Sequence, residues 1–381
     1  VAEELEEDAL RRAGQYRCYI ASKLEGAQFD QSATRVLRGP RLSPTCVAVA
    51  PDESFVACGC KDSAIVRWDL ASGQRIKLSG GRSSMMQHDE DGNGSSSRSK
   101  QSGHLSDVLS IAISADSRLM ISGGRDSAML LWDVRTSSVV HQFKGHQSPI
   151  TALARRRDGD GPELYTASDD RTARVWDVDQ RGYVETLYGH QESICAVDAL
   201  CDQHLVTGGA DRTVRLWKVA EEIQLIFSSG HTAPVDCVSM LHAEAFVSGS
   251  QDGSLALWSA KRKKPLSTVR AAHGTAPWGG ACWLSALASP AFSDLVLSGS
   301  CDGHLRMWHA DEGNRSLTPL MSTPITGFIN GIALAPSAKF AAVAVGQEHR
   351  LGRWFRIPEA RNSVCIVPLP EVMHTKQRLV A

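Results

Sequence analysis

Histidine, a hydroxyl residue and aspartate recur together along this chain, and one such set could act as a hydrolytic triad. Each aspartate stands four residues after a serine or threonine and six residues before a tryptophan. An enzyme needs one triad, whereas this chain repeats the set at matching positions. We therefore interpret the sets as structural networks rather than as chemistry. The network residues are His104, Ser122, Asp126 and Trp132; His146, Thr166, Asp170 and Trp176; His190, Thr207, Asp211 and Trp217; His231, Ser248, Asp252 and Trp258; and His273, Ser298, Asp302 and Trp308.

The sets belong to a longer repeat that must shape the whole fold. Seven tryptophans each follow an acid by six residues, and the shortest interval between them is 41 residues, as from Trp176 to Trp217. This spacing is typical of WD repeats, in which each repeat supplies one four-stranded propeller blade. The sequence thus predicts an all-β, seven-bladed WD-repeat β-propeller over residues 33–371. The seven tryptophans are Trp68, Trp132, Trp176, Trp217, Trp258, Trp308 and Trp354.

The segments between these landmarks support the repeat. Short apolar or alternating runs such as "RTVRLWKV" are typical of strands separated by turns. A single blade could not be stable alone, because it buries both faces against its neighbours. Metal-ligand spacing, a glycine-rich phosphate loop and an unrepeated triad are all missing from the sequence, so we expect no enzyme, no cofactor and no metal.

Composition sets further limits. The chain has 381 residues, 42% of them hydrophobic, and a formal net charge of −1, so bulk attraction to nucleic acid or membranes is not expected. The ten cysteines are scattered, and the closest pair, Cys58 and Cys60, lacks CxxC spacing. No apolar run approaches the length of about 18–20 residues that spans a bilayer. The polar first residues do not resemble a signal peptide.

Three segments depart from the blades. Residues 1–32 are expected to form a short amphipathic helix and a linker, because apolar residues recur there at helical spacing. Residues 81–103 are polar and rich in serine and glycine, which predicts a disordered loop between blades. Residues 372–381 are expected to be a tail. The cluster "KRKK" at 261–264 is either a solvated turn or a nuclear-localisation signal.

The last repeat departs from the pattern of the others. Its acid is Glu348 instead of aspartate, and Arg353 stands directly before the tryptophan, where five other repeats carry leucine, valine or methionine. Arg67 occupies this place in the first repeat. Because the first and last blades of a closed ring are neighbours, these arginines would meet at one seam. They either pair with acids such as Glu348 and Glu359 or bind an external anion.

The closure of the ring has two candidate strands. The segment "ATRVLRG" (33–39) resembles the outer strands of later repeats, which predicts that it completes the last blade. The segment "SVCIVPL" (363–369) lies at the spacing where an outer strand also belongs. One of them is expected to be the outer strand, and the other an extra strand or a surface strap.

The segments "GFINGIALAPSAKFAAVAVGQEHRLGRWFRIPEARNSVCIVPL" (327–369) and "YVETLYGHQESICAVDAL" (183–200) resemble the WD-repeat family specific to the U3 small nucleolar ribonucleoprotein. The resemblance implies a nuclear, nucleolar protein of the small-subunit processome. It implies binding to the box B/C region of U3 small nucleolar RNA with the kink-turn-binding protein and other box C/D core proteins. It also implies a non-catalytic role in pre-rRNA processing and small ribosomal subunit assembly, without a membrane or small-molecule substrate.

The resemblance also indicates candidate contact residues. The arginines suit RNA because a guanidinium bonds phosphate bidentately and stacks on bases. A general protein-interaction scaffold, such as a ubiquitin-ligase substrate receptor, is the alternative function, and RNA co-purification would separate the two. The candidates for RNA or partner binding are His349, Arg350, Arg353, Arg356, Arg361, Asn362 and Arg67.

Overall fold

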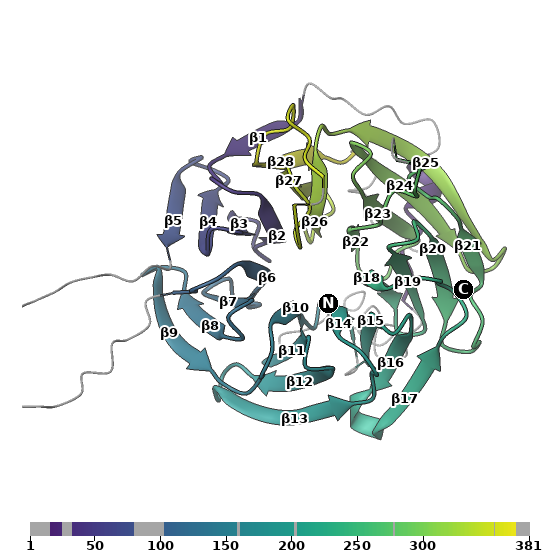
Figure 1. The fold of residues 1–381 in the computed structure, drawn as a ribbon, viewed down its shortest axis with the longest axis horizontal. Coiled ribbons are helices and arrows are strands. Elements are labelled where there is room, and N and C mark those ends of the chain that lie inside the picture. The colour runs from purple at the N-terminus through teal and green to yellow at the C-terminus, as the bar shows by residue number, and fades with distance from the viewer. Residues whose placement is uncertain are drawn as a thin grey trace, which may run out of the picture.

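The short strands pair in sequence order into seven four-stranded sheets, which stand around a central channel as the blades of a propeller (Figure 1). The computed structural model describes residues 16–24, 33–79, 103–157, 161–201, 204–276, 279–353 and 355–370. The predicted seven-bladed WD-repeat architecture is confirmed. The predicted loop at 81–103, apart from its last residue, and the predicted tail at 372–381 lie outside the described residues.

The innermost strand of each blade comes first in sequence, except that the last blade takes its outer strand from the amino-terminal side. Blades 1 to 3 contain β2 (Pro44–Val49), β3 (Phe55–Cys60), β4 (Ala64–Asp69) and β5 (Arg75–Ser79); β6 (Val108–Ile113), β7 (Leu119–Gly124), β8 (Met129–Asp133) and β9 (Ser138–Phe143); and β10 (Ile150–Arg155), β11 (Glu163–Ser168), β12 (Thr172–Asp177) and β13 (Gly182–Tyr188). Blades 4 to 6 contain β14 (Ile194–Ala199), β15 (His204–Gly209), β16 (Val214–Lys218) and β17 (Ile223–Phe227); β18 (Val235–His242), β19 (Ala245–Ser250), β20 (Leu255–Ser259) and β21 (Ser267–Val269); and β22 (Ala286–Ala288), β23 (Leu295–Gly299), β24 (His304–Asp311) and β25 (Ser316–Pro324). Blade 7 contains β26 (Phe328–Leu334), β27 (Phe340–Gly346), β28 (Ser363–Pro368) and β1 (Arg35–Arg38).

The ring closes through β1, which pairs antiparallel with β28 from Arg35↔Ile366 to Arg38↔Ser363. The prediction that residues 33–39 complete the last blade is therefore confirmed. The alternative for residues 363–369 was wrong in both forms, since β28 is the third strand of the blade and neither an outer strand nor a strap. It pairs with β27 on its other side.

The register of blade 7 corrects the position of its acid and tryptophan. In blade 2, Trp132 pairs with Met120 near the start of β7, whereas in blade 7 the partner of Ala341 in β27 is Val367. The strand that should carry the tryptophan therefore has valine there. Glu348 lies in an insertion between β27 and β28, and Trp354 precedes β28 and lies outside the described residues.

Neighbouring blades are joined at bulges in their innermost strands. The bulge releases one residue from the sheet ladder, and its polar side chain bonds to the next blade. Thr151 Oγ1 donates to the Ile194 carbonyl at 2.5 Å, and Asn330 Nδ2 donates to the Pro44 carbonyl at 2.8 Å. The second bond crosses the seam between blades 7 and 1, where the ring closes.

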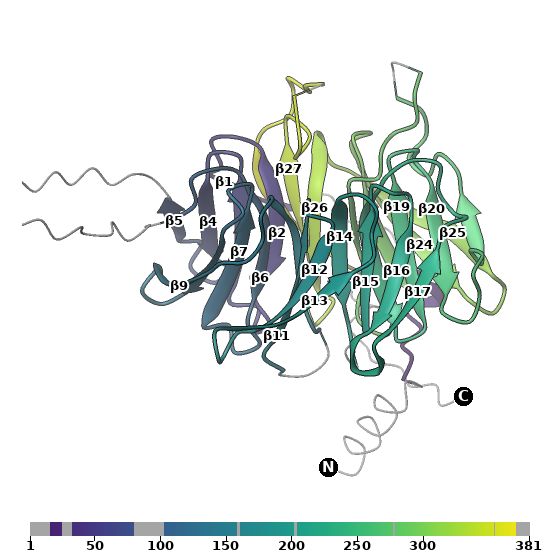
Figure 2. The same cartoon turned by 60° about the horizontal axis from the view of Figure 1, so that its bottom comes forward.

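The amino-terminal segment differs from its predicted helix. Cys18 forms an isolated bridge with Ser293, and only η1 (Ala21–Leu24), a single 3-10 turn, is helical among residues 16–24. The backbone N–H groups of Ile20 and Ala21 both donate to Asp294 Oδ1, at 2.8 and 3.1 Å. This carboxylate therefore fixes the segment on blade 6, on the face opposite the insertion before β28 (Figure 2). Residues 1–15 and 25–32 lie outside the described part of the chain.

One arginine holds several blades together on that same face. Arg157, which follows β10, donates through Nη2 to Asp198 Oδ2 at 2.7 Å and to the Met240 carbonyl at 2.6 Å, and through Nη1 to the Ser289 carbonyl at 2.6 Å. These acceptors belong to blades 4, 5 and 6, while Arg157 itself follows blade 3. It lines a channel cavity of ≈ 790 Å³. Arg157, the last of three consecutive arginines at 155–157, therefore joins four blades from inside the ring.

Candidate nucleic-acid interface

The repeated polar sets form closed networks inside the blades. In blade 2, His104 Nε2 lies 2.6 Å from Ser122 Oγ, His104 Nδ1 lies 3.1 Å from the Asp126 carboxylate, and Trp132 Nε1 donates to Ser122 Oγ at 2.8 Å. The hydroxyl is fully buried. Because it is enclosed and already bonded to two partners, it has no access to a substrate. The same contacts recur in blades 3, 4 and 6.

Blade 5 builds its network differently. His231 Nδ1 lies 2.6 Å from Ser254 Oγ, while the Asp252 carboxylate accepts the Thr232 N–H at 2.8 Å. His231 still reaches Ser248 Oγ at 2.6 Å, and Trp258 donates to that hydroxyl at 2.7 Å. Burial lowers the pKa of His231 to about 4, so the ring is neutral near pH 7.

We expect Asp211→Ala to lower the free energy of unfolding by about 1–3 kcal/mol, because His190 and Thr213 lose a partly buried acceptor. Burial would raise the pKa of Asp211, but the hydrogen bonds from His190 and Thr213 outweigh it and hold the pKa below its usual range. A lowered folded-state pKa gives stability above the unfolded pKa that is lost as pH falls through the folded value. The deficit of the variant should therefore shrink in acid.

Urea unfolding of both proteins at a series of pH values measures this deficit. RNA affinity per folded molecule should be unchanged. Unchanged stability together with lost RNA binding would show that the structural interpretation of the networks is wrong.

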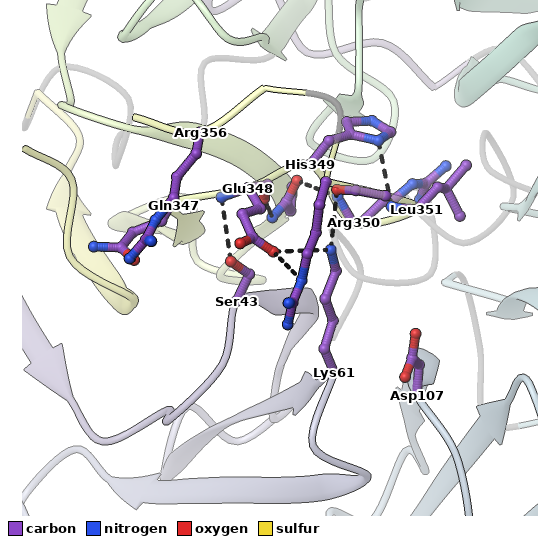
Figure 3. Close-up of polar contacts among 12 residues, drawn as sticks. Ser43, Lys61, Asp107, Gln347, Glu348, His349, Arg350, Leu351 and Arg356 are labelled. Carbon is purple, nitrogen blue, oxygen red and sulfur yellow. Dashed lines mark hydrogen bonds and ion pairs between the residues drawn. The ribbon is translucent and has the colours of Figure 1, made fainter. Parts of the chain in front are cut away.

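The insertion between β27 and β28 of blade 7, residues 347–362, is called the closing loop, because it contacts blade 1 where the ring closes. Glu348 Oε2 lies 3.7 Å from Lys61 Nζ and 3.1 Å from Arg353 Nε (Figure 3). Lys61 Nζ also donates to the Gly352 carbonyl at 3.2 Å, and the Glu348 N–H donates to Ser43 Oγ at 3.2 Å. The acid thus anchors the loop through ion pairs, and the predicted pairing of Arg353 with Glu348 is present.

Two asparagines fix the two ends of the closing loop. Asn330 is 1% exposed, and its Oδ1 accepts the Arg350 N–H at 2.9 Å while its Nδ2 donates to the Glu348 carbonyl at 3.0 Å. Asn362 Oδ1 accepts the Gln347 N–H at 3.0 Å. These amides satisfy backbone groups that would otherwise lack partners in a loop with little sheet pairing. Asn362 is therefore an anchor of the loop.

Arg350 and His349 point toward the interior of the ring. Arg350 Nη2 donates at 3.0 Å to the carbonyl of Asp236, a residue of blade 5 that is 1% exposed. Burial raises the pKa of the Asp236 carboxyl, and the Arg350 charge opposes this shift. His349 is 4% exposed and packs its ring edge-on against Trp283, at a centroid distance of 5.6 Å. Burial is also the main reason that the pKa of His349 falls to about 3.

The remaining arginines of the closing loop face outward. The Arg353 side chain is 68% exposed despite its ion pair, Arg356 is exposed and donates from Nη2 to Gln347 Oε1 at 2.8 Å, and Arg361 is exposed. Phe355 lies among them and is 42% exposed. These four side chains sit on a loop whose backbone is held by blades 1 and 7.

Arg67 does not join this group. Its guanidinium donates to the Val134 carbonyl of blade 2 and lies over the Phe55 ring, 5.4 Å from its centroid. It therefore belongs to the seam between blades 1 and 2, and the expected meeting of Arg67 with Arg353 at one seam was wrong. Lys61, Ser43 and Asn330 were missed as site residues, because only the ring closure brings them to the loop.

Seven four-stranded blades, five of which carry buried polar networks of histidine, hydroxyl and tryptophan side chains, define a WD-repeat β-propeller, and its distinguishing feature is the closing loop. The chain belongs to the family of U3 snoRNP-associated WD-repeat proteins. It is 40% identical to "U3 small nucleolar RNA-interacting protein 2" of Homo sapiens over 98% of this chain and 76% of that protein. It is 33% identical to "U3 snoRNP-associated protein-like EMB2271" of Arabidopsis thaliana over 97% of this chain and 78% of that protein.

Family models and solved structures agree with this assignment. A model described as "Nucleolar protein 10-like, N-terminal domain" matches residues 17–213, and the "WD domain, G-beta repeat" model matches residues 223–259 and 272–309. The solved structure of U3-55K is similar with a TM-score of 0.81 and 40% sequence identity, over 90% of this chain and 100% of that one. The crystal structure of the RRP9 WD40 repeats gives the same TM-score and identity, over 90% of this chain and 99% of that one.

Proposed function

We propose that this protein is a non-catalytic RNA- and protein-binding component of the U3 small nucleolar ribonucleoprotein. In this role it recognises the U3 box B/C region with the kink-turn-binding protein. It acts in pre-rRNA processing and small ribosomal subunit assembly, within the nucleus and nucleolus. Its partners are U3 RNA, box C/D core proteins and other small-subunit processome proteins. The names of its relatives, which refer to U3 RNA and the U3 ribonucleoprotein, support this proposal.

The observation that carries the proposal is the outward group of arginines on a braced loop. The chain is nearly neutral overall, so RNA binding must depend on local charge. Arg353, Arg356 and Arg361 are exposed, and the loop's backbone is fixed by contacts to Lys61, Ser43 and Asn330. A fixed backbone reduces the entropy lost when long side chains engage a ligand.

The placement of the repeated hydroxyls favours a binding role over catalysis. The repeated hydroxyls are buried within the blades. Among the residues that the structure describes, no group of three or more His, Cys, Asp and Glu side chains is arranged to hold a metal ion. In the same part of the chain, no helix combines the length and apolar character needed to cross a membrane.

The test is a salt titration of U3 RNA binding by the double variant Arg356→Ala with Arg361→Ala. We expect weaker binding and a flatter salt dependence, because each lost phosphate contact reduces the slope by a little under one unit. The melting temperature should be unchanged, since both side chains are exposed.

The matched control is Arg118→Ala with Arg135→Ala. These arginines are also exposed but lie in turns on the opposite face of the ring. If the closing-loop variant and the control bind U3 RNA equally well at every salt concentration, the closing loop does not contact RNA. If the wild-type protein itself does not bind U3 RNA, a role as a protein-interaction scaffold is favoured instead.

A further inference from the structure

Phe355 is an exposed aromatic side chain of the closing loop. Single exposed apolar residues are common on protein surfaces and by themselves indicate nothing. Phe355 differs in its neighbours along the chain, because Arg353 precedes it by two residues, Arg356 follows it directly, and both arginines are exposed. An aromatic ring on the same short stretch as two exposed cations has the chemical character of a site for a planar, negatively charged ligand.

The ring of Phe355 has a defined orientation. It meets Phe328 edge-on, with a centroid distance of 6.0 Å and an interplanar angle of 69°. Phe328 is itself only 5% exposed and contacts the buried His349 ring at 6.3 Å. A buried aromatic pair therefore supports Phe355 from below, while 42% of its surface remains open to solvent. Such support fixes the position of the ring before a ligand binds.

Cations outnumber acids in the closing loop. It carries four arginines against two acids, Glu348 and Glu359, and Glu348 is already shared between Lys61 and Arg353. Arg41 is also exposed, and its carbonyl accepts the Asn362 side-chain amide at 3.3 Å, which places it beside the end of the loop. Anions are therefore favoured here.

We infer that Phe355 stacks on an unpaired base of single-stranded RNA while the neighbouring arginines bind its phosphates. The inference rests on the proposed function and specifies the form of RNA that the closing loop takes. Bases within a duplex already stack on one another, so an aromatic side chain can reach only a base that is unpaired and turned out. Stacking on aromatic rings combined with backbone contacts from basic residues is the common way to hold single strands.

The experiment compares Phe355→Leu with Phe355→Trp, using a single-stranded segment of U3 RNA and the same segment annealed to its complement. Leucine keeps apolar contact with Phe328 but loses the flat ring, whereas tryptophan keeps a ring. We expect Phe355→Leu to weaken single-strand binding about tenfold and to leave its salt slope unchanged, because no phosphate contact is lost. Phe355→Trp should bind at least as tightly as the wild-type protein.

A second measurement detects base stacking directly, by fluorescence. Single strands carrying 2-aminopurine at successive positions are titrated with the wild-type protein, and stacking at Phe355 should quench one position that Phe355→Leu leaves bright. The inference is overturned if Phe355→Leu binds the single strand as the wild type does, or if it weakens duplex and single strand equally. It is also overturned if the variant keeps RNA binding but loses the purified kink-turn-binding protein, since Phe355 would then be a protein contact. Wild-type protein that binds no U3 RNA would refute the proposed function itself, a result visible before any variant is compared.

Discussion

Arg157→Ala should lower the free energy of unfolding by about 3 kcal/mol. Arg157 forms an ion pair with Asp198, and it also donates to carbonyls of two further blades. Its side chain is 28% exposed, so the pair is largely shielded from solvent. Removing the guanidinium leaves the Asp198 carboxylate poorly solvated and without a counter-charge, and such losses are expensive.

The pH dependence of this variant has a definite sign. Burial raises the pKa of Asp198, and the Arg157 charge opposes the shift, so the pKa should rise further in the variant. A raised folded-state pKa means that the folded protein holds the proton more tightly than the unfolded chain does. Stability is then lost as pH rises through the folded pKa. The deficit of Arg157→Ala should be largest at neutral pH and smaller in mild acid.

Urea unfolding of Arg157→Ala, with Arg118→Ala as the control, tests whether Arg157 stabilises the contacts between these blades. The Arg118 side chain is 86% exposed, so its removal should change stability little. Equal unfolding midpoints for the two variants at neutral pH would contradict the role assigned to Arg157.

Arg350→Ala should lower the free energy of unfolding by about 2–3 kcal/mol, since it removes a charged donor to a buried carbonyl. It also removes the positive charge that opposes the raised pKa of Asp236. RNA affinity per folded molecule should stay near that of the wild type, because the side chain points into the ring. Arg350→Ala should therefore lose stability and keep RNA binding, whereas Arg356→Ala with Arg361→Ala should keep stability and lose RNA binding.

Thermal melts and RNA binding are measured on the same Arg350→Ala preparation. Arg350→Lys serves as the comparison, because it keeps the charge and loses the planar fork. An unchanged melting temperature with much weaker RNA binding would return Arg350 to the group of RNA contacts.

The sequence predicted what is periodic in this molecule. Repeated spacing identified the blades and gathered residues such as His104, Ser122 and Asp126 into one network, because each set is local to one blade. The match of residues 33–39 to later outer strands also predicted the closure of the ring. Each of these conclusions came from comparing one repeat of the chain with the other repeats.

The sequence failed where the chain departs from its own period. Glu348 stands six residues before Trp354 by coincidence, because both residues belong to the closing loop. The repeat pattern therefore predicted the third strand of blade 7 around Trp354, whereas the third strand is β28. The partner of Arg350 lies 114 residues away in blade 5, and no local pattern indicates which way that side chain turns. Phe355 was missed for the same reason, since its exposure depends on how Phe328 and the loop pack.

The pairing of β1 with β28 also affects how the chain matures on the ribosome. β1 is synthesised before every blade, yet its only sheet neighbour, β28, is among the last strands to emerge. A nascent chain that has reached blade 6 therefore carries an unpaired strand, and free strand edges invite aggregation. β1 has arginine at both of its ends, Arg35 and Arg38, and both are exposed. Charges on a free strand edge oppose pairing with other chains, so both arginines suit a strand that must wait for β28 before the ring can close.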